Sequence, residues 1–230
     1  IKIYPPVIMI VSYIAGGIFM SEEQNNIKEY GTVNSDGIEI VTIIGEIEGH
    51  QNLGRDSKTT SYEHMLPMLA SYERNTGVKG ILYLINTIGG DVSCGLSMAE
   101  MIAGLSKPSV SLIIGDSHSI GLPIAAAADY SYIVPSATVV IHPVRMSGTI
   151  LGTRQTYRQF KSIQDRIINF VASHSECPEN ELEKMMMETS MMAKDLGTIL
   201  VGQEAVDVGL VNQCGSISDA LDKLSGMICK

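Results

Sequence analysis

A serine and a histidine lie at the ends of two predicted strands in the middle of the chain. Ser119 falls where the apolar run 110–114, predicted to be a buried strand, leads into an alanine-rich helix over 122–128. Free backbone N–H groups and the positive end of the helix dipole at such a junction favour developing negative charge. A second short strand, over 138–141, ends at His142. A hydroxyl and an imidazole so placed suit nucleophilic acyl chemistry, and the alternative is a helix-capping serine beside a structural histidine.

A glycine pair follows the preceding predicted strand. The continuous apolar strand over 81–85 leads to Gly89 and Gly90, and a helix over 91–105 comes next. Because glycine has no Cβ, this turn offers bare backbone N–H groups to a ligand oxygen. The order strand, glycine pair, helix, strand predicts a βαβ unit with parallel strands. The glycine turn and the turn at Ser119 are therefore expected together at the carboxyl ends of neighbouring strands, where sites in open α/β sheets form.

Other predicted elements must hold these two turns in place. Residues 153–174 form a long helix with an apolar stripe, which either projects to pair with another subunit or packs on its own sheet. The remaining predicted elements are a strand over 38–44, a polar loop over 45–60, a helix beginning near 62, a turn over 115–121, a helix over 179–192, a short helix over 203–209, a strand over 210–212 and a final helix over 216–224.

Composition narrows the range of partners and sites. The 230 residues carry a net charge of −9 with no basic cluster, which argues against nucleic acid as a partner. Four cysteines show no paired spacing, and five histidines are scattered. We therefore expect no metal site, no cofactor and no disulfide framework, and free thiols in a reducing, cytoplasmic setting.

The first twenty residues form an apolar leader whose status the sequence leaves open. Residues 3–20 carry no charge over about the minimum length of a membrane span. Proline and glycine pairs interrupt the run, and Met20, followed by a polar segment, resembles an initiator. The leader is upstream sequence, a membrane anchor or an ordinary N-terminal segment, so the protein is expected in the cytoplasm, with membrane association as the alternative. Residues 21–230 are predicted to form a single domain.

Ordered motifs over about residues 27–225 resemble the ClpP family of serine peptidases. They are NTIGG over 86–90, HSIG over 118–121, VIHP over 140–143 and EAVDVGLVN over 204–212. Within that family the sequence resembles the ClpP-like translocation-enhancing proteins of spore-forming bacteria. The resemblance implies an α/β architecture of the ClpP/crotonase type, with stacked parallel βαβ units and a projecting long helix.

The resemblance also implies roles for individual residues. Ser119 matches the nucleophile of the family and His142 its general base. Gly90 and Ile120 match the two positions whose backbone N–H groups form the oxyanion hole.

The third residue of the triad is less well matched. The resemblance implies an aspartate after the long helices, and Asp195 is the candidate. The spacing of the family would instead place this residue at Gly197, so Asp195 requires a local two-residue insertion. Asp207 is a further candidate, although it matches a helix residue. His118 replaces a small residue beside the nucleophile and is expected to alter activity or crowd the site.

By resemblance, the protein is expected to be a serine endopeptidase acting on polypeptides within a homo-oligomeric ring, as a stacked double heptamer. Family proteases receive unfolded chains from an ATPase partner, and this protein is further expected to have a link to protein translocation or quality control. Two other functions stay open. One is a catalytically weak or inactive ClpP-like scaffold or chaperone. The other is a crotonase-type acyl-CoA enzyme, for which a basic surface would be expected, and this acidic chain has no basic cluster.

Overall fold

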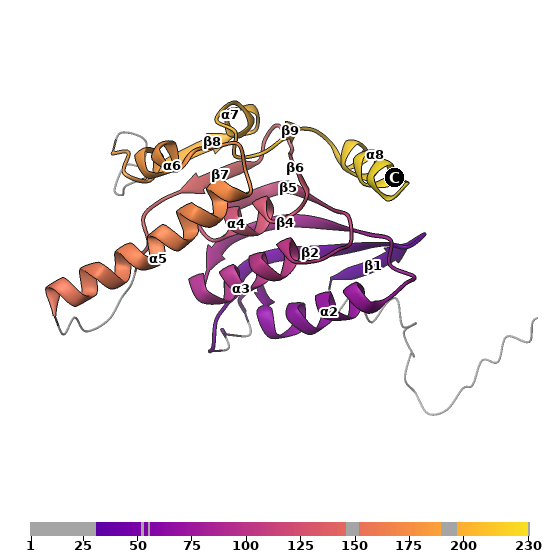
Figure 1. The fold of residues 1–230 in the computed structure, drawn as a ribbon, viewed down its shortest axis with the longest axis horizontal. Coiled ribbons are helices and arrows are strands. Elements are labelled where there is room, and N and C mark those ends of the chain that lie inside the picture. Colours follow the sequence, from indigo (N-terminus) through magenta and orange to yellow (C-terminus); the bar gives the residue numbers. More distant parts are fainter. Residues whose placement is uncertain (1–30, 52, 55, 146–151, 190–196, 230) are drawn as a thin grey trace, which may run out of the picture.

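The computed structural model describes residues 31–51, 53–54, 56–145, 152–189 and 197–229. Within these ranges the chain forms a nine-stranded mixed sheet (Figure 1). Its strands are β1 (Thr32–Ser35), β2 (Ile38–Glu48), β3 (Thr59–Ser61), β4 (Gly80–Gly90), β5 (Ser109–His118), β6 (Tyr130–Ile133), β7 (Thr138–Ile141), β8 (Thr198–Val201) and β9 (Gln213–Cys214). The predicted leader over residues 1–20 lies outside the described residues.

The centre of the sheet is parallel, as the βαβ pattern predicts. β4 pairs in parallel with β2 and with β5, and β5 pairs in parallel with both β6 and β7. Only the pairs β1–β2 and β7–β8 are antiparallel among the described strands. The carboxyl ends of β4, β5 and β7 therefore meet at one edge of the fold, and the turns that carry the predicted site follow them.

Helices cover both faces of the amino-terminal halves of the strands. The helices of the described ranges are α2 (Tyr62–Arg74), α3 (Val92–Ala103), α4 (Gly121–Ala126), α5 (Thr153–Ser173), α6 (Glu179–Met186), α7 (Gln203–Asp207) and α8 (Ile217–Ile228). Ile81 and Tyr83 point to a core shared with α2, α3 and α4, whereas Leu82, between them, joins a smaller core with α8. This alternation explains why the strands are continuously apolar in sequence.

On the face of the sheet that α8 covers, the part near the carboxyl ends of the strands is left without a covering helix among the described residues. Ile44, Ile88 and Ile114 are exposed there, at 40%, 61% and 41% of their surface. Each lies beyond the part of its strand that α8 covers. The predicted site thus borders a partly apolar, uncovered strip of the sheet.

The long helix α5 projects from the body of the molecule (Figure 1). Its buried residues, Ile167, Ile168, Phe170 and Val171, all lie in its C-terminal half. Tyr157, on the predicted apolar stripe, is 69% exposed. The first turns of α5 therefore make no core contact within the described chain. None of the helices in the described ranges has both the length and the apolar character needed to cross a membrane.

Several element boundaries differ from the predictions. β5 continues to His118 through the predicted turn, and β2 continues to Glu48 into the predicted loop. The predicted strand over 210–212 is wrong, since the strand here is β9 at Gln213–Cys214. α6 ends at Met186, earlier than predicted. The strand extensions depend on pairing with distant strands, which local sequence patterns do not report.

Candidate active site

Ser119, His142 and Gly90 line one cavity of about 210 Å³. It lies at the carboxyl ends of β4, β5 and β7, where the sequence predicts the site. The other lining residues are apolar apart from one arginine: Ile88, Val92, Leu122, Ile141, Val144, Arg145, Ile167, Ile168, Val171, Leu182 and Met186. The contribution of α5 and α6 to this apolar wall was not anticipated, because it depends on how segments distant in sequence pack together.

Ser119 occupies a strained backbone turn. Its φ is +55°, and it shares a positive φ with just one other non-glycine residue of the described chain, Asp36. Such a conformation costs about 1–3 kcal/mol and persists only where the surroundings enforce it. Here the Ser119 N–H donates to Val140 O at 2.8 Å, which ties the turn to β7. Ile120 occupies the N-cap of α4, so Ser119 is not the capping residue.

The glycine turn packs directly against this serine. A Cβ placed on Gly89 would lie 2.9 Å from Ser119 Cβ and 3.5 Å from Ile120 N. A Cβ on Gly90 would lie 2.2 Å from Ile47 O. Both glycines have a positive φ, of +91° and +153°. The close approach of the two turns thus requires glycine, and it places Gly89, the neighbour of Gly90, against Ile120. Of the two predicted oxyanion residues, Gly90 lines the cavity, whereas Ile120 is buried and is not among the lining residues.

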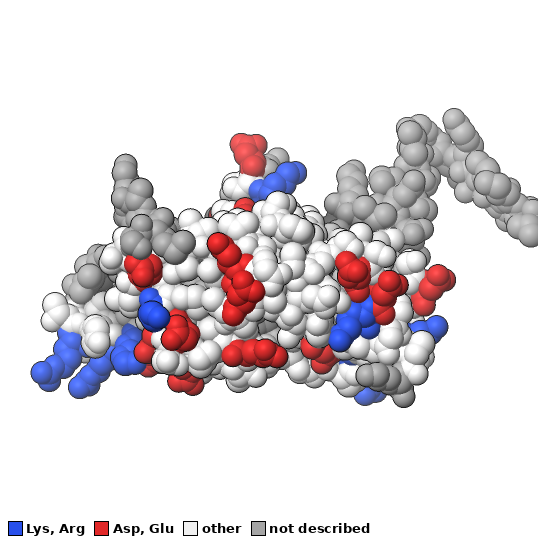
Figure 2. Space-filling model, turned by 90° about the horizontal axis from the view of Figure 1, so that it is seen from above, with Lys and Arg blue, Asp and Glu red and all other residues white. Residues whose placement is uncertain are grey.

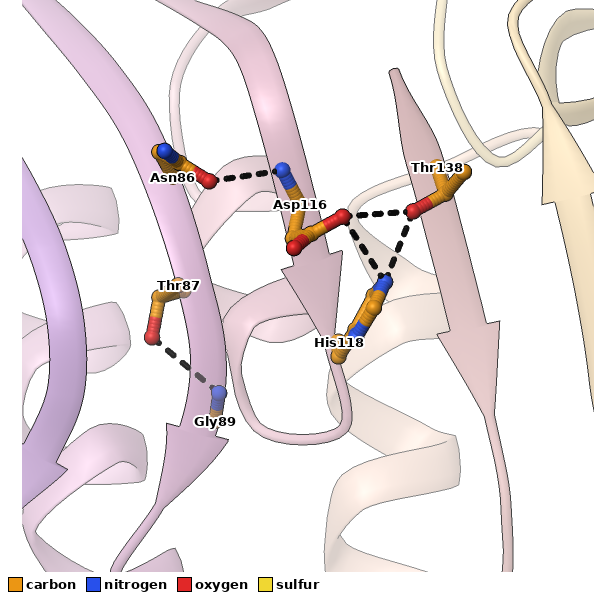
Figure 3. Close-up of polar contacts among 6 residues, drawn as sticks. All are labelled: Asn86, Thr87, Gly89, Asp116, His118 and Thr138. Carbon is orange, nitrogen blue, oxygen red and sulfur yellow. Dashed lines mark hydrogen bonds and ion pairs between the residues drawn. The ribbon is translucent and has the colours of Figure 1, made fainter.

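Polar side chains beneath the turn fix its backbone. Thr87 Oγ1 accepts from Gly89 N–H at 3.1 Å and donates to Gly45 O at 2.5 Å (the first bond is drawn in Figure 3). Thr87 is fully buried. One hydroxyl therefore ties the glycine turn to β2.

His142 follows β7 and is half-buried in the cavity wall. Its Nδ1 lies 2.7 Å from Pro143 O. Because a carbonyl only accepts hydrogen bonds, Nδ1 is the donor in this contact, which leaves Nε2 as the ring nitrogen that can accept a proton. This is the tautomer that a general base needs.

Asp195 lies outside the described residues, so the structure neither places nor excludes it. Asp207 lies on α7, where its Oδ1 accepts from Gln203 Nε2 at 2.9 Å, and it is not among the cavity residues. Gly197 is next to His142: a Cβ on this glycine would lie 3.0 Å from His142 Cβ.

A second histidine belongs to a polar cluster that the sequence did not reveal (Figure 3). Thr138 Oγ1 donates to Asp116 Oδ1 at 2.7 Å, and His118 Nε2 lies 2.7 Å from the same hydroxyl and 3.3 Å from Asp116 Oδ1. Asn86 Oδ1 accepts from Asp116 N–H at 2.9 Å. Since the threonine hydrogen goes to the carboxylate, His118 Nε2 is the donor to Thr138.

His118 is therefore turned toward β7 and does not line the cavity. Burial lowers its pKa, and the nearby His142 lowers it further, whereas Asp116 acts in the opposite direction. The imidazole is accordingly neutral near pH 7. His118 therefore does not crowd the cavity as the sequence suggested. Its side chain instead bonds to Thr138 and so links β5 to β7 next to the serine.

A buried carboxylate anchors the loop next to the glycine turn. Glu48 is 7% exposed, follows Ile47, and accepts hydrogen bonds from Leu53 N–H at 2.6 Å and from the hydroxyl of Ser61. The bond from Ser61 is the main reason that the pKa of Glu48 is lowered. Because Ile47 pairs with Gly90, this anchor stabilises the strand on which the glycine turn rests.

The described part of the chain holds no group of three His, Cys, Asp or Glu side chains that could bind a metal ion. What the arrangement offers is a strained serine, an imidazole whose Nδ1 has a carbonyl partner, a glycine turn packed against the serine and an apolar cavity. This set suits attack on an acyl carbon rather than chemistry that needs a charged cofactor cradle.

Comparison with known proteins gives one family match and three similar proteins. The model of the Clp protease family matches residues 37–217. The translocation-enhancing protein TepA of Halalkalibacterium halodurans is 42% identical over 207 residues, which is 90% of this chain and 80% of that protein. The ATP-dependent Clp protease proteolytic subunit of Leuconostoc citreum is 28% identical over 157 residues, covering 65% of this chain and 72% of the subunit. The putative signal peptide peptidase SppA of Enterococcus faecium is 25% identical over 193 residues, covering 71% of this chain and 55% of that protein.

Proposed function

This chain belongs to the Clp protease family, and we propose that it is a serine endopeptidase in which Ser119 is the nucleophile and His142 the general base. The observation that carries the proposal is the shared cavity. Ser119, His142 and Gly90 come from three different strand ends and yet line the same 210 Å³ space. The strained φ of Ser119 supports the proposal, because such strain is found at sites where function requires it.

The proposed reaction follows from these positions. Ser119 Oγ forms a bond to the carbonyl carbon of a peptide while His142 Nε2 takes the hydroxyl proton. The backbone N–H groups of Gly90 and Ile120 stabilise the negative oxygen of the tetrahedral intermediate. The C–N bond then breaks as His142 gives the proton to the leaving amine. Water attacks the resulting ester, His142 accepts its proton, and the proton returns to Ser119 as the acid leaves.

The cavity favours polypeptide substrates with an apolar side chain next to the cleaved bond. Nearly all of its wall consists of aliphatic or methionine side chains. An apolar group of moderate size would displace water from this wall and bring its backbone carbonyl to Ser119.

We propose that the protein assembles into a homo-oligomeric ring through α5, as a stacked double heptamer. The exposed first turns of α5 support assembly, because they carry Tyr157 without a core contact. Figure 2 shows Lys and Arg gathered at the end of the molecule where α5 projects in Figure 1, whereas the chain as a whole is acidic. The basic end of one copy is therefore complementary in charge to the acidic surface of another.

The proposal also includes an ATPase partner, a link to protein translocation or quality control, and a cytoplasmic location. The first two rest on the names of the relatives, an ATP-dependent protease subunit and a translocation-enhancing protein. Membrane association through residues 1–20 remains the alternative location.

A second candidate is a non-catalytic ClpP-like scaffold. It is favoured by Gly197, a glycine at the position where the spacing of the family calls for the aspartate, beside His142. A scaffold would keep the fold and the cavity while lacking turnover.

Hydrolysis of an unfolded polypeptide by the purified chain tests the proposal against this alternative. We expect wild-type protein to cleave it and Ser119→Ala to be inactive with unchanged circular dichroism. Ser117→Ala is the matched control: Ser117 is fully buried and its hydroxyl has no partner among the described residues, so this variant should keep its activity. Activity in Ser119→Ala, or its absence from a folded and assembled wild type, would contradict the proposal.

A further inference from the structure

The pairing of β4 with β5 is interrupted shortly before the serine. Its register shifts between Ile85 and Thr87, so that residues 114–116 of β5 lie opposite the single residue Asn86. Bulges of this kind bend a strand and change the direction of its side chains, and they are frequent next to active sites. At this point a side chain takes the place of a backbone partner, since Asn86 Oδ1 accepts from Asp116 N–H at 2.9 Å.

The side chains of Asp116, Thr138 and His118 continue this link from β5 to β7 (Figure 3). Thr138 Oγ1 donates to Asp116 Oδ1 at 2.7 Å, and His118 Nε2 donates to the same threonine oxygen at 2.7 Å. With Asn86 these residues form a side-chain network that crosses β4, β5 and β7. These are the three strands whose carboxyl ends carry the residues of the candidate active site.

The network lies directly before the strained turn of Ser119. The register of β5 with β7 covers three residue pairs, and two of them, Asp116 with Thr138 and His118 with Val140, contain members of the network. Val140 O also accepts from Ser119 N–H at 2.8 Å. Because a φ of +55° persists only where the surroundings enforce it, whatever holds β5 against β7 here also holds the serine.

On the premise of the serine peptidase function above, we propose that Asp116, Thr138 and His118 are positioning residues. Their bonds hold the end of β5 against β7 and so keep Ser119 within reach of His142. None of the three lines the cavity, so they act through the backbone of the serine turn and not by contact with substrate. Loss of the network should therefore lower kcat and leave KM nearly unchanged, because the apolar wall that binds substrate stays in place.

The first test compares Thr138→Val with Thr138→Ser in peptide hydrolysis. Valine has the shape of threonine without its hydroxyl, whereas serine keeps the hydroxyl. We expect Thr138→Val to lower kcat by about 10–10²-fold, since a small misplacement of a reacting group costs that much. KM should stay within about twofold of wild type, and Thr138→Ser should keep kcat within about threefold.

The matched control is Thr42→Val. The hydroxyl of Thr42 donates to Gly31 O at 3.0 Å, on the side of β2 that faces away from β5 and β7. This variant loses a hydroxyl bond without touching the network, so it should keep the wild-type kcat. If Thr138→Val also keeps the wild-type kcat, or if Thr138→Ser loses as much as Thr138→Val, the inference is overturned and the proposed peptidase function stands.

The second test is amide hydrogen exchange, which does not depend on turnover. We expect the N–H of Ser119 to exchange at least about tenfold faster in Thr138→Val than in wild type, and Thr138→Ser to exchange at the wild-type rate. The N–H of Ile81, bonded to Pro108 O at 2.9 Å at the amino end of β4, should exchange at the same rate in all three proteins.

The two tests separate the inference from its premise. Equal exchange of the Ser119 N–H in wild type and Thr138→Val, or an equal rise at Ile81, would overturn the inference. Faster exchange at Ser119 alone, in a protein whose wild type hydrolyses no peptide, would support the network as the support of the serine turn and contradict the proposed function.

Discussion

Replacement of Gly90 by alanine should damage both the fold and the chemistry, for reasons that the structure makes explicit. The φ of Gly90 is +153°, a region that is nearly restricted to glycine. The new Cβ would lie 2.2 Å from Ile47 O and 2.7 Å from Ile47 N. Both are backbone atoms of the paired strand β2, so they cannot move aside as a flexible side chain can.

The expected magnitudes follow from these two effects. Strain at such a φ is worth about 1–3 kcal/mol, and we expect the free energy of unfolding to fall by at least that amount. If Ile47 moved to make room for the new Cβ, the 3.0 Å hydrogen bond from Asp91 N–H to Ile47 O would be stretched or lost. Displacing one oxyanion donor should lower kcat by about 10²–10³-fold. Urea denaturation measures the first effect and peptide hydrolysis the second.

The matched control is Gly226→Ala in α8. A Cβ at Gly226 meets no atom within 4 Å, and glycine in a helix interior costs about 0.5–1 kcal/mol relative to alanine. This variant should be slightly more stable than wild type, with the same kcat. The reasoning is refuted if Gly90→Ala unfolds at the same urea concentration as wild type or hydrolyses peptides at the wild-type rate.

Three further predictions concern groups around the site. Glu48→Gln should lower the free energy of unfolding by about 1 kcal/mol at neutral pH; because the folded-state pKa of Glu48 is lowered, the difference should shrink as the pH falls through that pKa. Since the pKa of His118 is also lowered, wild type should lose stability as the pH falls below the ordinary pKa of histidine, because the unfolded chain takes up the proton more readily than the folded one. His118→Asn should lack this part of the loss in urea titrations at neutral and at mildly acidic pH. Tyr157→Asp should shift sedimentation toward smaller species while leaving the melting temperature of the subunit nearly unchanged, because Tyr157 is exposed.

The sequence predicted the parallel centre of the sheet because the signal there is local. The apolar runs of β4 and β5, separated by one helix, require a parallel crossover whatever the rest of the chain does. The positions of Ser119 and Gly90 in one cavity follow from this crossover, because both turns lie at the carboxyl ends of these neighbouring strands.

The parts that were not predicted depend on pairing between distant segments. β5 runs on to His118 because Asp116 and His118 pair with Thr138 and Val140 of β7. The same register creates the cluster of Asp116, Thr138 and His118, and the spacing of these residues along the chain does not indicate it. The position of Gly197 beside His142 likewise follows from the pairing of β7 with β8.

The central claim is that Ser119 and His142 form a working pair, and labelling with a fluorophosphonate probe tests it most directly. The probe reacts with a serine only when an adjacent base activates it. Peptide mapping by mass spectrometry should place the label on Ser119 in wild type, and labelling should be lost in both Ser119→Ala and His142→Ala. A folded, assembled wild type that takes up no label, or a His142→Ala variant that is labelled as fast as wild type, would contradict the account.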